Sequence, residues 1–230
     1  TAGVTGGLLL ASLALINPGD EVIIPDPFFV MYEYQVLLMG GVPVSIDTYP
    51  DFRLREEELV KKISKKTKCI IINSPNNPTG AIYPKEDLMM AVRIAREKDL
   101  VILSDDIYDN FVFDTPSCPC IGQFYENTLT FGGFSKGWGM TGWRLGYAAG
   151  PRDILQQMIT LQQYTFSSVS SFAQKAAIKA LNYNVEDTIK GYEKKRDLIY
   201  EGLKEKFNVQ KPKGAFYIFP EVPGGNGEAF

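Results

Sequence analysis

The sequence predicts an α/β protein in which a mostly parallel sheet is sandwiched by helices, followed by the start of a smaller α/β domain. Short apolar runs alternate with longer stretches of helical character through most of the chain, as in doubly wound sheets. Residues 69–72 (Cys-Ile-Ile-Ile) are apolar without interruption, which is typical of a strand covered on both faces. Several apolar runs are also followed directly by polar residues, at the strand ends where such sheets bind ligands.

The first hundred residues are expected to form helices and strands in alternation. Proline and glycine interrupt the pattern at residues 17–20, at Pro25 and at Gly40-Gly41, where regular structure ends. Acidic residues begin the stretch 54–63 and lysines end it, which suits the dipole of a helix. Pro84 stands at a helix start, where its missing N–H costs little. The expected helices cover residues 6–16, 28–39, 54–63 and 84–98, and the expected strands cover residues 21–24, 42–46 and 69–72.

The rest of the chain is expected to add three strands to the same sheet and then to become mainly helical. Residues 214–220 have the composition of one more strand, in a new context. We therefore divide the chain into a large domain, residues 1–190, and residues 191–230, which hold an interdomain helix and the first strand of a smaller domain. The expected strands cover residues 100–103, 128–131 and 144–149, and the expected helices cover residues 151–163, 170–181 and 185–207.

Composition excludes several classes of protein. The 230 residues are 45% hydrophobic, enough to bury a substantial core. The net charge of −3 and the lack of a basic run argue against a nucleic-acid partner. No apolar run approaches the roughly 18 residues of a membrane span, and three cysteines are few for a disulfide framework. We expect a soluble, cytoplasmic protein with reduced thiols and no membrane partner.

The absence of histidine restricts the chemistry further. Hydrolysis by a Ser-His-Asp or Cys-His arrangement cannot be built from this chain, and a zinc site is not expected at Cys118-Pro119-Cys120. Proton transfer would then fall to Lys, Asp, Glu, Tyr or Cys side chains.

A glycine-rich loop around Lys136 is the most unusual stretch of the sequence. Residues 133–144 read Gly-Phe-Ser-Lys-Gly-Trp-Gly-Met-Thr-Gly-Trp-Arg. Glycine lets the backbone approach a ligand closely, and apolar neighbours remove water from an amine, whose pKa then falls. Lys136 could therefore act as a nucleophile or a base. The alternative is a surface loop with an incidental lysine, and spacing alone favours neither.

Polar side chains cluster near the ends of the predicted strands. These residues are Asn77, Asp105, Tyr108 and Lys136. Because the carboxyl ends of parallel strands meet at one edge of a sheet, we expect these side chains to share a crevice. Each has a plain alternative, such as a turn for Asn77 or a helix cap for Asp105. Their occurrence together favours a binding site.

Two further features suit an anion. Thr5 stands beside a glycine turn that leads into a helix, whose free N–H groups and dipole favour phosphate. Arg144 follows the lysine loop, although it could also form a surface ion pair. A lysine for a Schiff base, an acid for a ring nitrogen and an arginine for a phosphate are what pyridoxal 5'-phosphate requires. We expect this compound as the cofactor.

At this point the chain resembles the class I and II aminotransferases, the aspartate aminotransferase superfamily of fold type I. The resemblance is carried by three motifs and covers nearly all of residues 1–220. The motifs are Asn-Asn-Pro-Thr-Gly at 76–80, Ser-Asp-Asp-Ile-Tyr at 104–108, and the glycine-rich residues 133–146 around Lys136.

The resemblance implies roles for the residues around the cofactor ring. Lys136 would form the Schiff base and, once displaced, move a proton between substrate and cofactor. Asp105 would pair with the pyridine nitrogen, and that cation would lower the pKa of Asp105. Asn77 and Tyr108 would hydrogen-bond the 3' oxygen of the ring, and Phe29 would stack on its face.

The resemblance also implies a phosphate site. Arg144 would bind the phosphate together with the backbone N–H groups of Val4 and Thr5 and the Thr5 hydroxyl. Many members have a serine where this chain has Gly133, so a backbone amide there, or the Ser135 side chain, would take its place.

The resemblance also implies an activity, in which an amino group moves between an L-amino acid and a 2-oxo acid. It further implies a homodimer with shared active sites. Full-length members are longer at both ends, and their C-terminal small domain supplies the arginine for the substrate carboxylate. We therefore expect these 230 residues to be part of a longer polypeptide. The alternatives are a C–S lyase or related elimination enzyme of the same fold, a cofactor-sensing domain of a transcription regulator, and a degenerate structural domain.

Overall fold

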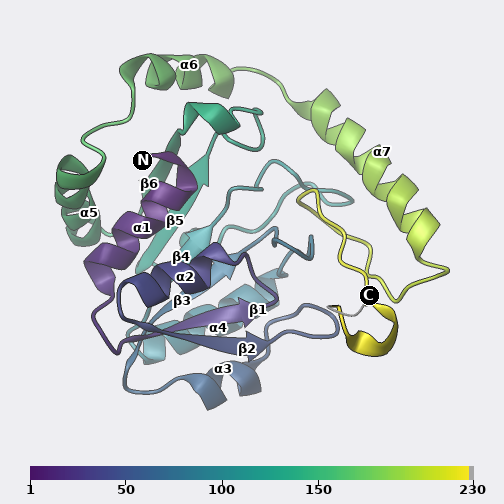
Figure 1. The fold of residues 1–230 in the computed structure, drawn as a ribbon, viewed down its shortest axis with the longest axis horizontal. Helices are drawn as coiled ribbons and strands as arrows, with labels where there is room; N and C mark the ends of the chain where they lie inside the picture. The colour runs from purple at the N-terminus through teal and green to yellow at the C-terminus, as the bar shows by residue number, and fades with distance from the viewer. Residues whose placement is uncertain (228–230) are drawn as a thin grey trace.

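The computed structural model describes residues 1–227 of the chain. In this part of the chain, six strands form one sheet in the order β2-β1-β3-β4-β5-β6 (Figure 1). Neighbouring strands are parallel except for β5 and β6, which pair antiparallel at one edge. The predicted mostly parallel sheet is confirmed. The strands are β1 (Glu21–Asp26), β2 (Val42–Asp47), β3 (Thr67–Asn73), β4 (Val101–Asp105), β5 (Thr128–Gly133) and β6 (Gly146–Ala149).

Helices cover both faces of this sheet. Side chains alternate between the faces along each strand, so in β3 Cys69 and Ile71 join the core under α1, α2 and α5. Ile70 and Ile72 join the core under α3 and α4 on the other face. This two-sided burial is the reason for the uninterrupted apolar run of β3. The helices are α1 (Gly3–Leu15), α2 (Met31–Leu38), α3 (Glu56–Lys62), α4 (Lys85–Glu97), α5 (Arg152–Thr165), α6 (Ser171–Leu181) and α7 (Glu186–Leu203).

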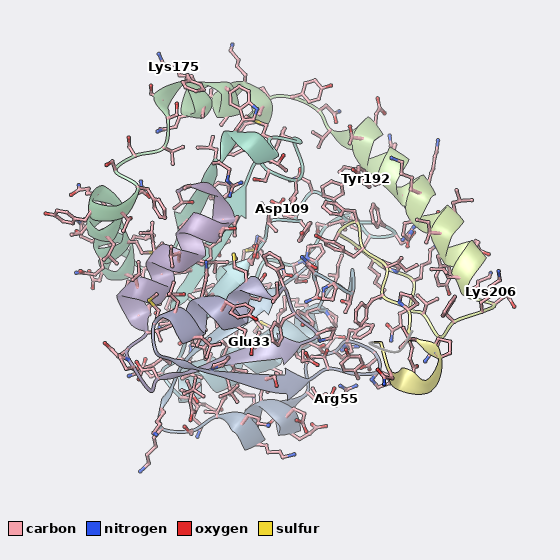
Figure 2. All side chains as sticks on the ribbon, in the orientation of Figure 1. Glu33, Arg55, Asp109, Lys175, Tyr192 and Lys206 are labelled. Carbon is pink, nitrogen blue, oxygen red and sulfur yellow. The ribbon has the colours of Figure 1, made fainter. Side chains whose placement is uncertain are left out.

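The last two helices lie along the outer rim of the molecule, and the C-terminal segment runs back from α7 toward the sheet (Figure 1). Lys175 on α6 and Lys206 after α7 lie on the outside, whereas Tyr192 lies on the inner side of α7 (Figure 2). The Tyr192 ring packs edge-on against Phe111, with ring centroids 5.1 Å apart. Within residues 1–227, no helix combines the length and the apolar character needed to cross a membrane.

Arg196 connects α7 to the loop after β4 and to the C-terminal segment. It is only 7% exposed. Its guanidinium donates to Asp114 at 2.6 Å and to the carbonyl oxygen of Pro212 at 2.8 Å. It therefore holds the residues after β4 and the returning C-terminal segment against the same helix.

Several predicted element bounds need correction: β1 continues through Pro25 to Asp26, and α2 begins at Met31 rather than at residue 28. Residues 214–220 form no strand, because their bridges to Val112 and Val209 each involve a single residue pair and no neighbouring strand extends them. The first helix starts at Gly3 rather than at Gly6, since its glycines continue the helix instead of preceding it. The division of the chain after residue 190 falls inside α7 and stays a prediction.

Candidate active site

A cavity of about 310 Å³ lies beyond the carboxyl ends of the parallel strands. Eight of the nine residues predicted to bind the cofactor line it, so the structure brings them together in one cavity, while their roles stay predictions. These eight are Val4, Thr5, Phe29, Asn77, Asp105, Tyr108, Lys136 and Arg144.

The ends of three neighbouring strands carry the central part of this site. Asp105 is the last residue of β4, Asn77 follows β3, and Lys136 follows β5. The side chain of Asn73, at the end of β3, joins two of these ends. Its amide donates to the carbonyl oxygen of Asp105 at 2.8 Å, and its side-chain oxygen accepts from the backbone N–H of Asn77 at 2.8 Å. Through these two hydrogen bonds, the side chain of Asn73 fixes the distance between Asp105 and Asn77.

Asp105 is a buried acid held by two hydrogen bonds. It is 3% exposed. The Tyr32 hydroxyl donates to Oδ2 at 2.8 Å, and the backbone N–H of Ile107 donates to Oδ1 at 3.1 Å. Burial raises the pKa of Asp105 to about 6, although both hydrogen bonds and Lys136 oppose the rise. A cation against this carboxylate would lower its pKa again.

Lys136 lies half-buried among aromatic rings. Its Nζ is 5.4 Å from the centre of the Phe216 ring and 5.8 Å from the centre of the Tyr108 ring. Such rings attract an ammonium group through their faces while excluding water from it. The aromatic surroundings of the lysine therefore come from Tyr108 and from Phe216 of the C-terminal segment, rather than from the apolar residues of its own loop.

Tyr108 hydrogen-bonds a second phenol. The hydroxyl oxygens of Tyr108 and Tyr217 are 2.6 Å apart. Burial raises the pKa of Tyr108 most strongly, the bond with Tyr217 raises it further, and a hydrogen bond with Asn77 lowers it. At neutral pH Tyr108 therefore keeps its proton, and its side chain lines the cavity.

The other end of the cavity suits an anion. The N-terminus of α1, with Val4 and Thr5, lies beside Arg144, whose Nη1 is 3.4 Å from the Ser135 hydroxyl and 3.0 Å from the carbonyl oxygen of Thr141. Arg144 has a left-handed backbone, with φ of 50°. For a residue other than glycine this conformation is unfavourable, and it is typical of functional sites.

Gly3 makes room for the arginine. A Cβ atom on Gly3 would lie 2.6 Å from Nη2 of Arg144, and the φ of Gly3 is 69°. Only glycine accepts that backbone and that approach without strain. Because Gly3 has no side chain, the Arg144 guanidinium lies directly beside the N-terminus of α1. These two kinds of group together are typical of phosphate-binding sites.

The whole chain matches the family model for "Aminotransferase class I and II", over residues 1–230. This chain belongs to the class I and II aminotransferase family. The probable aspartate aminotransferase of Methanocaldococcus jannaschii is 42% identical, over 96% of this chain and 61% of that protein. The aromatic-amino-acid aminotransferase 2 of Thermococcus litoralis is also 42% identical, over 96% of this chain and 60% of that protein.

Solved aminotransferase structures have the same fold. The aspartate aminotransferase of Thermotoga maritima matches with a TM-score of 0.94 and 35% identity, over 97% of this chain and 61% of that chain. A Thermus thermophilus aspartate aminotransferase with maleate matches with a TM-score of 0.92 and 36% identity, over 96% and 60%. The chain thus spans about three fifths of the length of these relatives.

The side chains that line the cavity of this aminotransferase chain have the chemical groups that pyridoxal phosphate requires. A half-buried amine, an acid with a hydrogen-bonded carboxylate, and a cradle that a Cβ on Gly3 would fill lie around one space. The cofactor's aldehyde, ring nitrogen and phosphate need these three kinds of group.

Gly133 is the one predicted site residue outside the cavity lining of this aminotransferase chain. It lies at the end of β5, paired with Gly146, and an added Cβ would lie 3.2 to 3.3 Å from Ile107, Leu145 and Val4. The glycine is thus needed for close packing behind the cavity. Its role as a phosphate ligand stays a prediction.

Sequence reasoning missed three polar residues of this site. Asn73 was read only as the end of a strand, and Tyr217 as part of one. In the predicted helix of residues 28–39, Tyr32 stands three residues after Phe29 and so on the same face, but an aromatic residue there is equally typical of a core. The bond from Tyr32 to Asp105 could be found only in three dimensions.

Proposed function

We propose that this chain is the cofactor-binding part of a pyridoxal-phosphate-dependent aminotransferase, which moves an amino group between an L-amino acid and a 2-oxo acid. The observation that carries the proposal is the position of Lys136 in one cavity with a buried acid, Asp105, and the anion cradle of Arg144 and α1. The names of the relatives, aspartate and aromatic-amino-acid aminotransferases, support the reaction and the class of substrate.

Pyridoxal phosphate supplies an aldehyde that condenses with an amine and a ring that accepts electrons. The residues of the chain do the rest. Lys136 would hold the aldehyde through its amine and, once released, could move a proton beside the substrate. Asp105 would keep a proton on the ring nitrogen, because a buried carboxylate stabilises a positive charge next to it. Tyr108 and Asn77 direct donors toward the ring oxygen.

The remaining residues hold the cofactor in place. Arg144, the N–H groups at the start of α1 and the Thr5 hydroxyl bind the phosphate. Phe29 lines the cavity and packs edge-on against Tyr32, with ring centroids 5.8 Å apart, and would stack on the cofactor ring.

We further propose that two copies associate and share active sites. Large apolar side chains are exposed on α5, α6 and the turns around them, including Tyr164 at 86%, Phe172 at 71% and Leu181 at 61%. Such a surface is typical of an interface between subunits. The division into a large domain and the beginning of a small one, after residue 190, is part of this proposal. A cytoplasmic location is supported by the three free cysteines.

The test is a half-reaction on the purified protein loaded with pyridoxal phosphate. An aminotransferase site gives a visible absorption band that changes when an amino acid is added, with one equivalent of 2-oxo acid released. Lys136→Ala is the control and should show neither the band of a lysine-bound cofactor nor the change. Release of pyruvate together with ammonia would favour elimination chemistry instead. Wild-type protein without any band would refute the proposal.

A further inference from the structure

The C-terminal segment of residues 212–217 docks directly onto two loops of the active site. The backbone N–H groups of Lys213 and Gly214 both donate to the carbonyl oxygen of Gly80, each at 2.9 Å. The N–H of Ala215 donates to the carbonyl oxygen of Phe111 at 2.9 Å, and the N–H of Phe113 donates to that of Lys213 at 2.7 Å. This segment, called the strap below, is therefore fixed to the loops that follow β3 and β4.

The fit between the strap and the loop after β3 is close. A Cβ on Gly80 would lie 2.6 Å from Pro212 and 2.8 Å from the carbonyl oxygen of Gly214. Behind the strap, Arg196 of α7 holds the carbonyl oxygen of Pro212 at 2.8 Å. The strap is thus clamped on both sides, and its side chains have defined positions.

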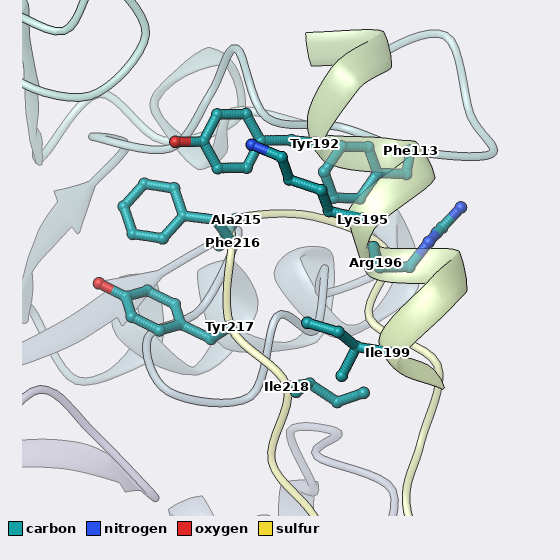
Figure 3. A pocket seen from close by; sticks show the side chains of 9 residues that line it. All are labelled: Phe113, Tyr192, Lys195, Arg196, Ile199, Ala215, Phe216, Tyr217 and Ile218. Carbon is teal, nitrogen blue, oxygen red and sulfur yellow. The ribbon is translucent and has the colours of Figure 1, made fainter. Parts of the chain in front are cut away.

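Two of those side chains reach the site. Figure 3 shows a pocket between α7 and residues 215–218, in which the rings of Phe216 and Tyr217 extend away from Ile199 on α7. Phe216 packs against Tyr108, with ring centroids 5.3 Å apart, and lies over the Lys136 amine. Tyr217 lines the cavity itself, and its hydroxyl oxygen is 2.6 Å from that of Tyr108.

We propose that Tyr217 is a positioning residue that acts on the cofactor through Tyr108. Either hydroxyl of this pair can donate, and with the cofactor bound the Tyr217 hydroxyl would donate to the Tyr108 oxygen, so that the proton of Tyr108 is directed at the 3' oxygen of the cofactor ring. This inference rests on the proposed function. It adds a residue from the strap to the set that tunes the lysine-bound cofactor.

The physical basis is cooperativity between hydrogen bonds. A hydroxyl that accepts one hydrogen bond becomes a stronger donor in the next, by roughly 10–30% per bond. Without Tyr217, Tyr108 would stabilise negative charge on the ring oxygen less well. The nitrogen that links Lys136 to the cofactor would then hold its proton to higher pH.

The experiment is a pH titration of the visible absorption band in protein loaded with pyridoxal phosphate. For Tyr217→Phe we expect the midpoint of the spectral change to move up by about 0.2 to 0.6 pH units. Tyr200→Phe, on α7 with its ring against Lys211, is the matched control and should keep the wild-type midpoint. An unchanged midpoint in Tyr217→Phe would overturn the proposal.

A double substitution tests whether the effect passes through Tyr108. In the Tyr108→Phe background, Tyr217→Phe should cause no further shift of the midpoint. A further shift of the same size would mean that Tyr217 acts directly or through the fold, which would also overturn the proposal.

A third measurement separates failure of this inference from failure of the proposed function. In cofactor-free protein, the hydroxyl proton shared in the Tyr108–Tyr217 hydrogen bond should exchange slowly and be visible by NMR, and it should be lost in Tyr217→Phe. Wild-type protein with this proton but without a cofactor band would refute the proposed function and not the tyrosine pair. A hydroxyl signal that persists in Tyr217→Phe would refute the pair.

Discussion

The substitution Asp105→Asn should stabilise the cofactor-free protein while it impairs the site. The carboxylate is 3% exposed and burial raises its pKa to about 6 from the ordinary value of 3.8. In the folded protein the charged form is therefore disfavoured relative to the unfolded chain. An amide of the same shape removes that cost and still accepts the hydrogen bond from the N–H of Ile107.

The size and sign of the effect follow from proton linkage. Each tenfold change in the acid dissociation constant corresponds to about 1.4 kcal/mol, so the rise of the pKa to about 6 costs the folded state about 3 kcal/mol above pH 6. The raised pKa means that the folded state binds the proton more tightly than the unfolded state between pH 3.8 and pH 6. The cost accordingly disappears as the pH falls toward 3.8.

Urea unfolding of wild type and Asp105→Asn at pH 7 and at pH 4 measures this difference. The variant should be more stable by about 3 kcal/mol at pH 7 and by less than about 1 kcal/mol at pH 4. The same variant should bind pyridoxal phosphate more weakly, because the ring nitrogen loses its acid. A variant less stable than wild type at pH 7, or a gain equal at both pH values, would refute the reasoning.

Three further substitutions test the other contacts. Arg144→Lys should weaken binding of pyridoxal phosphate by about ten- to a hundredfold, while binding of pyridoxal, which lacks the phosphate, should change little; equal losses for both compounds would contradict a phosphate role. Gly3→Ala should show the same selectivity in the same binding assay, since the new Cβ would lie 2.6 Å from the Arg144 guanidinium. Tyr32→Phe should lower stability by about 1.5 to 3 kcal/mol at pH 7, and less at pH 4 where the carboxyl is neutral, because it removes the 2.8 Å hydrogen bond to the Asp105 carboxylate; urea unfolding checks this, and a loss independent of pH would point to packing alone.

The sheet and most of the site could be predicted from the sequence because the information is local. An apolar run such as residues 69–72 has few interpretations, and the rule that strand ends meet then brings Asn77, Asp105 and Lys136 to one cavity. Tyr108 was predicted by the same rule, whereas Val4 and Phe29 followed only from the family resemblance.

The parts that could not be predicted depend on long-range docking. Residues 214–220 have the composition of a strand, but Gly214 meets a loop carbonyl on Gly80 instead of a strand edge. The hydrogen bonds of Tyr217 to Tyr108 and of Tyr32 to Asp105 join residues 109 and 73 positions apart. Periodicity and turn signals contain no information about such pairs.

The most direct test of the account is the location of the cofactor's covalent bond. Protein loaded with pyridoxal phosphate is reduced with borohydride, digested and examined by peptide mass spectrometry. The account predicts one phosphopyridoxyl group, on the peptide that contains Lys136, and its loss in Lys136→Ala. A label on a different lysine, or a label that persists in Lys136→Ala, would contradict it.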